Sequence, residues 1–165
     1  MINFNLNATN FYSYMREIAS KHKLIGKDSE EKNRKHFFIG ELEDFYKGLN
    51  SVVEFPALVV EGFKLNLSDE EQSTKYRESA FTVVFDYKDH DNYEQQTTCF
   101  SNSEDIGLEI LRKMNEDACE TICPIGISDI SGVQIINTKD KYAGIRFSFT
   151  LFNANVTEIN NLIWE

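Results

Sequence analysis

Four residues near the middle of this 165-residue chain have side chains that could bind a metal ion. They are Asp86, Asp89, His90 and Asp91. Carboxylates and imidazoles bind zinc, and carboxylates also bind harder cations such as calcium. Their spacing matches no known metal-binding loop, however, and acidic residues are common in turns. We therefore predict a turn at this position, and no metal site.

The three cysteines form neither a zinc motif nor a disulfide framework. Cys119 and Cys123 are four residues apart, and Cys99 is distant from both. Closed zinc sites usually have tighter ligand spacing, and an odd number of irregularly spaced cysteines does not indicate paired disulfides. We interpret the cysteines as buried free thiols, and we expect synthesis in a reducing cytoplasm.

No motif of a known enzyme class is present. The chain lacks a Gly-x-Ser-x-Gly elbow, a phosphate-binding loop and a Gly-x-Gly-x-x-Gly turn. His22 falls on the apolar face of a predicted helix, which is typical of a core or boundary histidine. Arg146 alternates with Phe147 along a predicted strand, so it lies on the opposite face, where Glu61 or Asp86 could pair with it. We predict no catalytic residue, no cofactor and no metal, and hence no enzyme.

Composition is typical of a soluble globular protein with an acidic surface. Hydrophobic residues make up 41% of the chain, and 27 acidic residues against 17 basic ones give a formal charge of −10. Such a surface repels duplex DNA, which proteins bind chiefly through Lys and Arg, so we expect no sequence-specific nucleic-acid binding. No apolar stretch approaches the roughly 18 residues of a membrane span, and the first residues do not resemble a signal peptide. We expect no membrane association.

The clearest pattern is a strand followed by a loop and an amphipathic helix. Apolar and polar residues alternate from Ser79 to Tyr87, as in a half-buried strand. Ser101 and Glu104 have the spacing of a capping box, which predicts a helix that begins near Ser101 and ends near Glu120. The buried side of this helix should be a row at every fourth position: Ile106, Ile110, Met114 and Ala118.

The remaining elements complete one α+β domain. We predict helices over Asn10–Ile25 and Glu41–Leu49, a strand over Phe55–Leu65, and a hairpin of Ile127–Asn137 with Tyr142–Asn153, while 36–40 is ambiguous. The chain is then a single domain with an N-terminal helical segment (1–50), a sheet-and-helix body (51–155) and a C-terminal tail (156–165). The expected architecture is an antiparallel sheet of about four strands, with the central helix packed on one face and the N-terminal helices beside it.

Three further segments are candidates for contact with other proteins. Residues 27–35 contain no apolar side chain and form either a mobile loop or a binding loop. Residues 66–78 form a connection longer than a usual hairpin loop, which is either a functional projection or a solvated tip. Its candidate interaction residues are Ser68, Asp69, Glu70, Glu71, Lys75 and Arg77. The tail is too apolar to stay in water without a reason, so it returns to the core or docks on a neighbour through Ile159, Leu162, Ile163 and Trp164.

The order of these elements, together with the strand Phe55-Pro56-Ala57-Leu58-Val59-Val60-Glu61, resembles the tail-terminator or tail-completion proteins of bacteriophages. The resemblance covers roughly residues 41–152. It implies a small α+β subunit that forms a ring at the head-proximal end of the tail tube, stops tube growth and makes the joint to the head. The implied partners are copies of the same chain and other tail or neck proteins. The implied location is the virion, after synthesis in the host cytoplasm.

Two other functions remain open. The acidic surface is compatible with a small cytoplasmic protein-binding or immunity-type protein that covers a basic partner. An enzyme with an unrecognised site would need a concave pocket with ionisable groups of shifted pKa, which a sequence does not reveal.

Overall fold

The computed structural model describes residues 8–26, 35–41, 45, 52–62, 64–68, 74–89, 92–119 and 125–153. Within these ranges the chain forms two helices, α1 (Ala8–Lys21) and α3 (Tyr93–Cys119). The strands are β1 (Lys35–Ile39), β2 (Val53–Val60), β3 (Lys64–Ser68), β4 (Thr74–Asp86), β5 (Ile125–Asn137) and β6 (Tyr142–Asn153). The predicted α+β class is confirmed.

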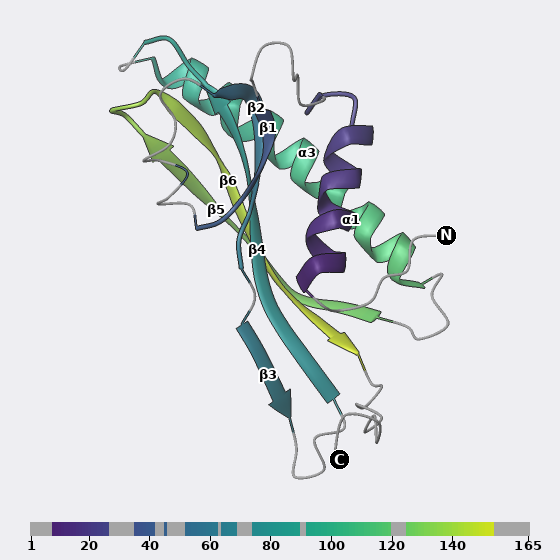
Figure 1. Ribbon diagram of the computed structural model, residues 1–165. Helices are drawn as coiled ribbons and strands as arrows, with labels where there is room; N and C mark the ends of the chain where they lie inside the picture. The colour runs from purple at the N-terminus through teal and green to yellow at the C-terminus, as the bar shows by residue number, and fades with distance from the viewer. Residues whose placement is uncertain are drawn as a thin grey trace.

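The strands form one open, mostly antiparallel sheet. The order across the sheet is β1-β2-β4-β6-β5, and β3 pairs with the first part of β4 beyond the end of β2. β1 and β2 are parallel, whereas every other neighbouring pair is antiparallel. The sheet is therefore wider than the four strands expected, because the ambiguous stretch at 36–40 belongs to β1. The two helices lie together on one face of the sheet, and β3 extends away from them with the start of β4 (Figure 1).

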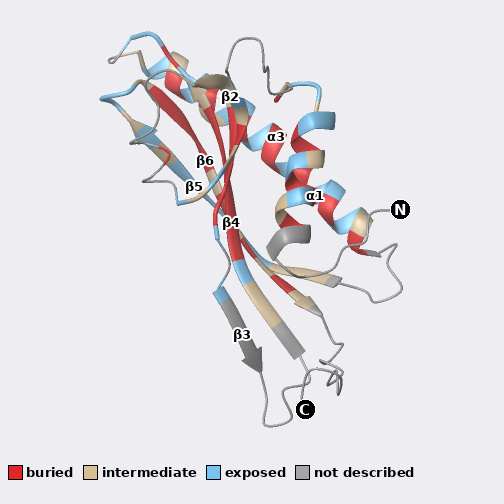
Figure 2. Ribbon diagram, viewed as in Figure 1, coloured by how far each residue is buried: buried red, intermediate tan, exposed pale blue. Residues whose placement is uncertain are grey.

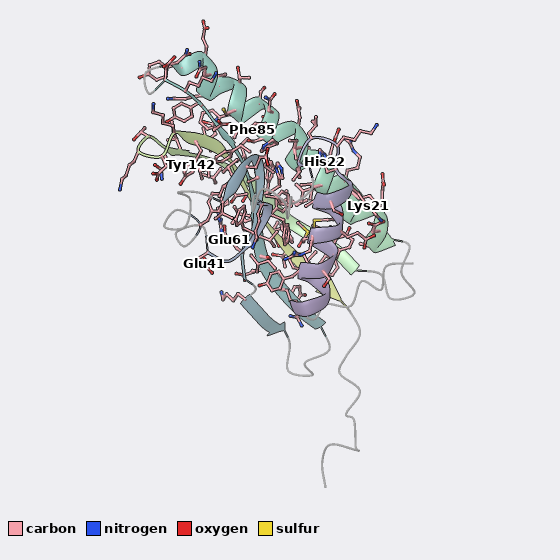
Figure 3. All side chains as sticks on the ribbon, turned by 45° about the horizontal axis from the view of Figure 1, so that its top comes forward. Lys21, His22, Glu41, Glu61, Phe85 and Tyr142 are labelled. Atoms are coloured by element: carbon pink, nitrogen blue, oxygen red, sulfur yellow. The ribbon has the colours of Figure 1, made fainter. Side chains whose placement is uncertain are left out.

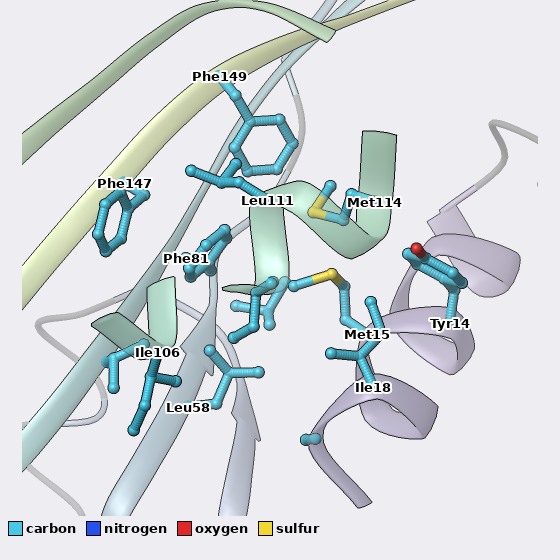
Figure 4. Close-up of a cluster of buried hydrophobic side chains, with 14 of the residues drawn as sticks. Tyr14, Met15, Ile18, Leu58, Phe81, Ile106, Leu111, Met114, Phe147 and Phe149 are labelled. Carbon is cyan, nitrogen blue, oxygen red and sulfur yellow. The ribbon is translucent and has the colours of Figure 1, made fainter. Parts of the chain in front are cut away.

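The main core lies between this face and the two helices. Phe81 of β4 stacks on Phe147 of β6, with ring centroids 5.3 Å apart, and both rings face α3 (Figure 4). The predicted row on α3 is confirmed, since Ile106, Ile110, Met114 and Ala118 are all buried in this core. α1 adds Met15 and Ile18 to the same cluster. Burial follows the middle of the sheet and the inward sides of both helices (Figure 2).

The opposite face carries a smaller apolar cluster at one end of the sheet. Phe45 packs there against Tyr142, with ring centroids 6.2 Å apart, and Val59 and Val84 complete the contact. Most of the predicted helix over Glu41–Leu49 lies outside the described residues, but Phe45 itself is helical and buried. Residues 27–34 also lie outside the described part.

The helix α3 begins earlier than predicted. Its first residue is Tyr93, and the side-chain Oδ1 of Asn92 accepts a hydrogen bond of 3.1 Å from the backbone N–H of Gln95. Ser101 and Glu104 are therefore inside the helix, and the predicted capping box is wrong. The helix end is confirmed, because the last helical residue is Cys119.

The C-terminal hairpin agrees with the prediction. β5 and β6 pair in register from Asn137 opposite Tyr142, and the side chain of Asn137 accepts a 2.9 Å hydrogen bond from the backbone N–H of Asp140. Lys141 adopts a left-handed conformation with φ of 56° to close the turn. The first helix, α1, ends at Lys21 rather than at Ile25, and a short turn leads to Gly26 at φ 77°.

Candidate interaction surface

The sheet face turned away from α1 and α3, here called the open face, is polar at its centre. Along β6, Phe147 and Phe149 pack toward the helices, so Arg146, Ser148 and Thr150 point to the open face. A hollow of about 490 Å³ lies over these residues. Its lining residues are Glu41, Glu61, Gly62, Lys64, Glu78, Ser79, Ala80, Asp129, Arg146, Ser148, Phe149 and Thr150.

An ion pair occupies the floor of this hollow. Arg146 Nε donates to Glu61 Oε1 at 2.6 Å, and the second terminal nitrogen of Arg146 donates to Glu61 Oε2 at 2.7 Å. These hydrogen bonds raise the pKa of Arg146, burial opposes the rise, and the nearby charges of Glu61 and Glu41 add to it. Of the two partners considered from the sequence, Glu61 is therefore the correct one. Asp86 instead lies opposite Tyr142 in the sheet register.

The hollow has an excess of negative charge. Four carboxylates line it, from Glu41, Glu61, Glu78 and Asp129, against the two cations of Lys64 and Arg146. Lys64 lies 3.5 Å from Glu78, and Ser128 donates to Asp129 at 2.9 Å. Glu41 and Glu61, which follow the ends of β1 and β2, are labelled in Figure 3 apart from Lys21 and His22 near α1. Such a surface attracts a basic group.

One buried hydroxyl beneath this face has no hydrogen-bond partner within the described part of the chain. Thr82 of β4 lies between Val59 of β2 and Arg146 of β6 in the sheet register, and it is fully buried. Its Oγ1 makes no hydrogen bond to any described atom. An unpaired buried hydroxyl has a desolvation cost, so Thr82 is a local weak point of the sheet.

The outer edge of β5 is the second feature of this surface. β5 pairs with β6 along its inner side, and among the described strands none pairs with its outer side. Three large apolar side chains of β5 are exposed, with exposed fractions of 51% for Ile130, 59% for Val133 and 47% for Ile136. Edge strands are usually protected by Lys or Pro, but the only charged residue in β5 is Asp129. A bulge between Ser128 and Ser131 interrupts the described pairing of β5 with β6.

Three of the six candidate interaction residues of 66–78 lie in strands. Ser68 is the last residue of β3 and pairs with Thr74, while Lys75 and Arg77 belong to β4. The prediction of a long connection is wrong because β3 and the start of β4 continue the sheet, where β4 pairs with β3 on one side and with the end of β6 on the other. Burial lowers the pKa of Arg77. Asp69, Glu70 and Glu71 lie outside the described residues, as do the tail residues Ile159, Leu162, Ile163 and Trp164.

The other residues considered for chemistry have structural contacts. Cys99 is buried near the backbone oxygen of Asp86, at 3.6 Å, and burial raises the pKa of its thiol, which lowers its reactivity. His22 lies 2.9 Å from Glu109 and joins α1 to α3, so its boundary role is confirmed. Asp89 is exposed, and His90 and Asp91 lie outside the described part. No group of three or more metal-binding side chains occurs among the described residues.

Comparison with known proteins adds no identity. No protein-family model matches the chain, and no curated protein is detectably similar to it. None of the described helices is both long and apolar enough to cross a membrane.

The sequence predicted a hairpin strand over Ile127–Asn137 but did not indicate that this strand is an edge of the sheet. Val133 and Ile135 share one face, and Ile136 lies on the other. A sequence indicates an unprotected edge strand chiefly by a lack of charged residues, and residues 131–137 contain no charged side chain.

Proposed function

We propose that this protein is a non-enzymatic structural subunit of a phage tail or tail-like particle, and that it assembles into a ring at the tail end or head–tail joint. The observation that carries the proposal is the unpaired outer edge of β5 with its exposed Ile130, Val133 and Ile136. An apolar edge of this kind is favourable for protein–protein contact and unfavourable in water.

A ring requires two different surfaces on each subunit, because its contacts are head to tail. The outer edge of β5 supplies one such surface, and the sheet is not symmetric, since its other edge strand, β1, is short and parallel to its neighbour. The formal charge of −10 also suits a ring through which DNA passes, because a negative lumen does not hold the phosphate backbone. The resemblance of element order to tail-completion proteins supports the same function.

Light scattering over a wide range of protein concentration, with negative-stain images of the same sample, tests the proposal. We expect closed rings with one number of subunits. A chain that remains a monomer at every concentration, and that does not bind the open end of a tail tube, would contradict it.

The hollow on the open face favours a second function. Its excess of carboxylates suits a small acidic protein that binds a basic partner. This function predicts a monomer or dimer whose binding to a lysine-rich peptide is lost in the double variant Glu41→Lys with Asp129→Lys. Rings that form equally well in that variant would exclude the hollow from the assembly contact.

A further inference from the structure

We propose that the outer edge of β5 binds residues 154–165 of a second copy of this chain as an added strand. Residues 154–165 are called the C-terminal arm below. This inference rests on the proposed ring and deepens it, because it names the two surfaces that meet in each contact.

The receiving surface is the run 131–137 of β5. Within the described part of the chain, the outward N–H and C=O groups of this run have no strand partner. Val133, opposite Arg146, is on the open face, and Ile136, opposite Ala143, is on the helix face. An added strand would therefore gain main-chain hydrogen bonds and apolar contacts on both of its sides.

The arm is long enough to cover this surface. Its twelve residues span about 40 Å when extended, at roughly 3.3 Å per residue. The receiving run 131–137 corresponds to about 23 Å of strand, at roughly 3.3 Å per residue, so the arm is long enough to cover it. The arm is also mostly apolar or neutral, with two charged side chains, Glu158 and Glu165, and the apolar residues Val156, Ile159, Leu162, Ile163 and Trp164.

The departure point of the arm favours a second copy as the receiver. Asn153, the last residue of β6, pairs with Lys75 of β4 on one side and with Ile125 of β5 on the other. The arm therefore leaves from an inner strand of the sheet. To reach the outer edge of its own β5 it would have to pass around Ile125 and spend part of its length in a turn. An arm that continues to a neighbour keeps its full length for pairing, and each copy then gives one arm and receives one, as a closed ring requires.

Two variants separate the donor from the receiver. The first ends at Asn153 and keeps the edge, and the second carries Val133→Lys with Ile136→Lys and keeps the arm. The matched control carries Leu24→Lys with Leu108→Lys, because these residues are exposed apolar side chains, 62% and 46% exposed, of the helical layer. We expect both test variants to lose assembly and the control to keep it, with unchanged circular dichroism in all three.

Mixing the two test variants gives the decisive measurement. Each has one intact surface, so the mixture should form a one-to-one dimer that cannot grow, observed by light scattering. Trp164 is the only tryptophan of the chain, and only the edge variant retains it. Its fluorescence should therefore shift to shorter wavelength when the arm-less chain is added.

The outcomes distinguish this inference from the proposed function. If the wild-type chain and both variants all form rings, the arm contact is contradicted and the proposed ring is supported. A monomeric wild-type chain, with Trp164 emission already at short wavelength and unchanged on mixing, would show the arm bound within its own chain and would overturn both. A mixed dimer without ring formation by the wild-type chain would support the arm contact and contradict the ring.

Discussion

Arg146 of β6 and Glu61, which directly follows β2, form a bidentate ion pair across the intervening strand β4. The two hydrogen bonds measure 2.6 Å and 2.7 Å. The partners differ in exposure, since 10% of the Glu61 side chain is exposed against 36% of the Arg146 side chain. The pair therefore joins the two strands that flank β4 on the open face, and its carboxylate is the better shielded of the two charges.

This difference in exposure predicts unequal effects of the two single variants. Arg146→Gln leaves a shielded carboxylate without its cation and should lower the free energy of unfolding by about 2 to 3 kcal/mol. Glu61→Gln leaves a cation that water partly solvates, so the loss should be about 1 kcal/mol. Urea denaturation at neutral pH measures both, and the double variant should lose less than the sum. Equal losses of stability in the two single variants would contradict the stronger shielding of the carboxylate. A loss in the double variant equal to the sum of the single losses would contradict coupling between the two residues.

Gly144 is required by the close approach of β6 to β4. A Cβ atom at this position would lie 1.9 Å from the backbone oxygen of Val83, and that backbone is held in the sheet. Gly144→Ala should therefore lower the free energy of unfolding by about 3 kcal/mol. Gly132→Ala is the matched control, because the nearest atom to its Cβ would be a side-chain methyl of Ile145 at 3.4 Å. We expect a change within about 0.5 kcal/mol for the control in thermal denaturation. Similar effects of both variants would argue against the tight strand contact.

The structure and the sequence pattern place the start of α3 at different residues, and two variants distinguish between them. Asn92 caps the helix through its bond to the N–H of Gln95, so Asn92→Ala should cost about 1 kcal/mol of stability. Ser101 lies in the exposed helix interior, so Ser101→Ala should be neutral or stabilising by up to about 0.5 kcal/mol. Urea denaturation of the two variants decides between the caps. If the helix began at Ser101, Ser101→Ala would lower the stability more than Asn92→Ala.

The elements that face the core were predictable, whereas the elements that extend beyond it were not. The alternation of Phe81, Val83 and Phe85 and the row from Ile106 to Ala118 arise because each residue faces the sheet–helix core. β3 pairs with the start of β4 away from that core, and its only sequence signal is the short alternation of Leu65 and Leu67 with polar residues, which the prediction of a loop did not use. The first two turns of α3, from Tyr93 to Phe100, are mostly polar for the same reason.

The candidate surface was predictable only in part. Glu61 was a possible partner of Arg146 because both lie on polar positions of predicted strands, but 85 residues separate them in the sequence. Which edge of the sheet stays unpaired depends on strand order, and strand order is set by contacts between distant strands such as β4 and β6. The exposure of Val133 follows from that order and not from its own neighbours.

Tyr14 should make the stability of the protein depend on alkaline pH. Its hydroxyl donates to Asp117 Oδ2 at 2.9 Å, and Lys113 holds the other oxygen of Asp117 at 2.7 Å. Burial raises the pKa of Tyr14 above its ordinary value of 10.0, and Asp117 and the charge of Glu17 raise it further. Below pH 10 the hydroxyl is protonated in both states, and Tyr14→Phe should lower the free energy of unfolding by about 1 to 2 kcal/mol.

Above pH 10 the contribution of the Tyr14 hydroxyl to the free energy of unfolding decreases. The unfolded chain then releases the Tyr14 proton while the folded chain keeps it, so rising pH favours the unfolded wild-type chain. The difference in stability between the wild-type chain and Tyr14→Phe should therefore shrink as pH rises past about 10. Urea denaturation at neutral pH and at several values above pH 10 measures it. Tyr93→Phe is the control and should keep wild-type stability at neutral pH, because the Tyr93 side chain is exposed. A constant difference across this range would contradict the raised pKa of the Tyr14 hydroxyl, and the absence of any difference would mean that Tyr14 stabilises the contact between α1 and α3 through its ring alone.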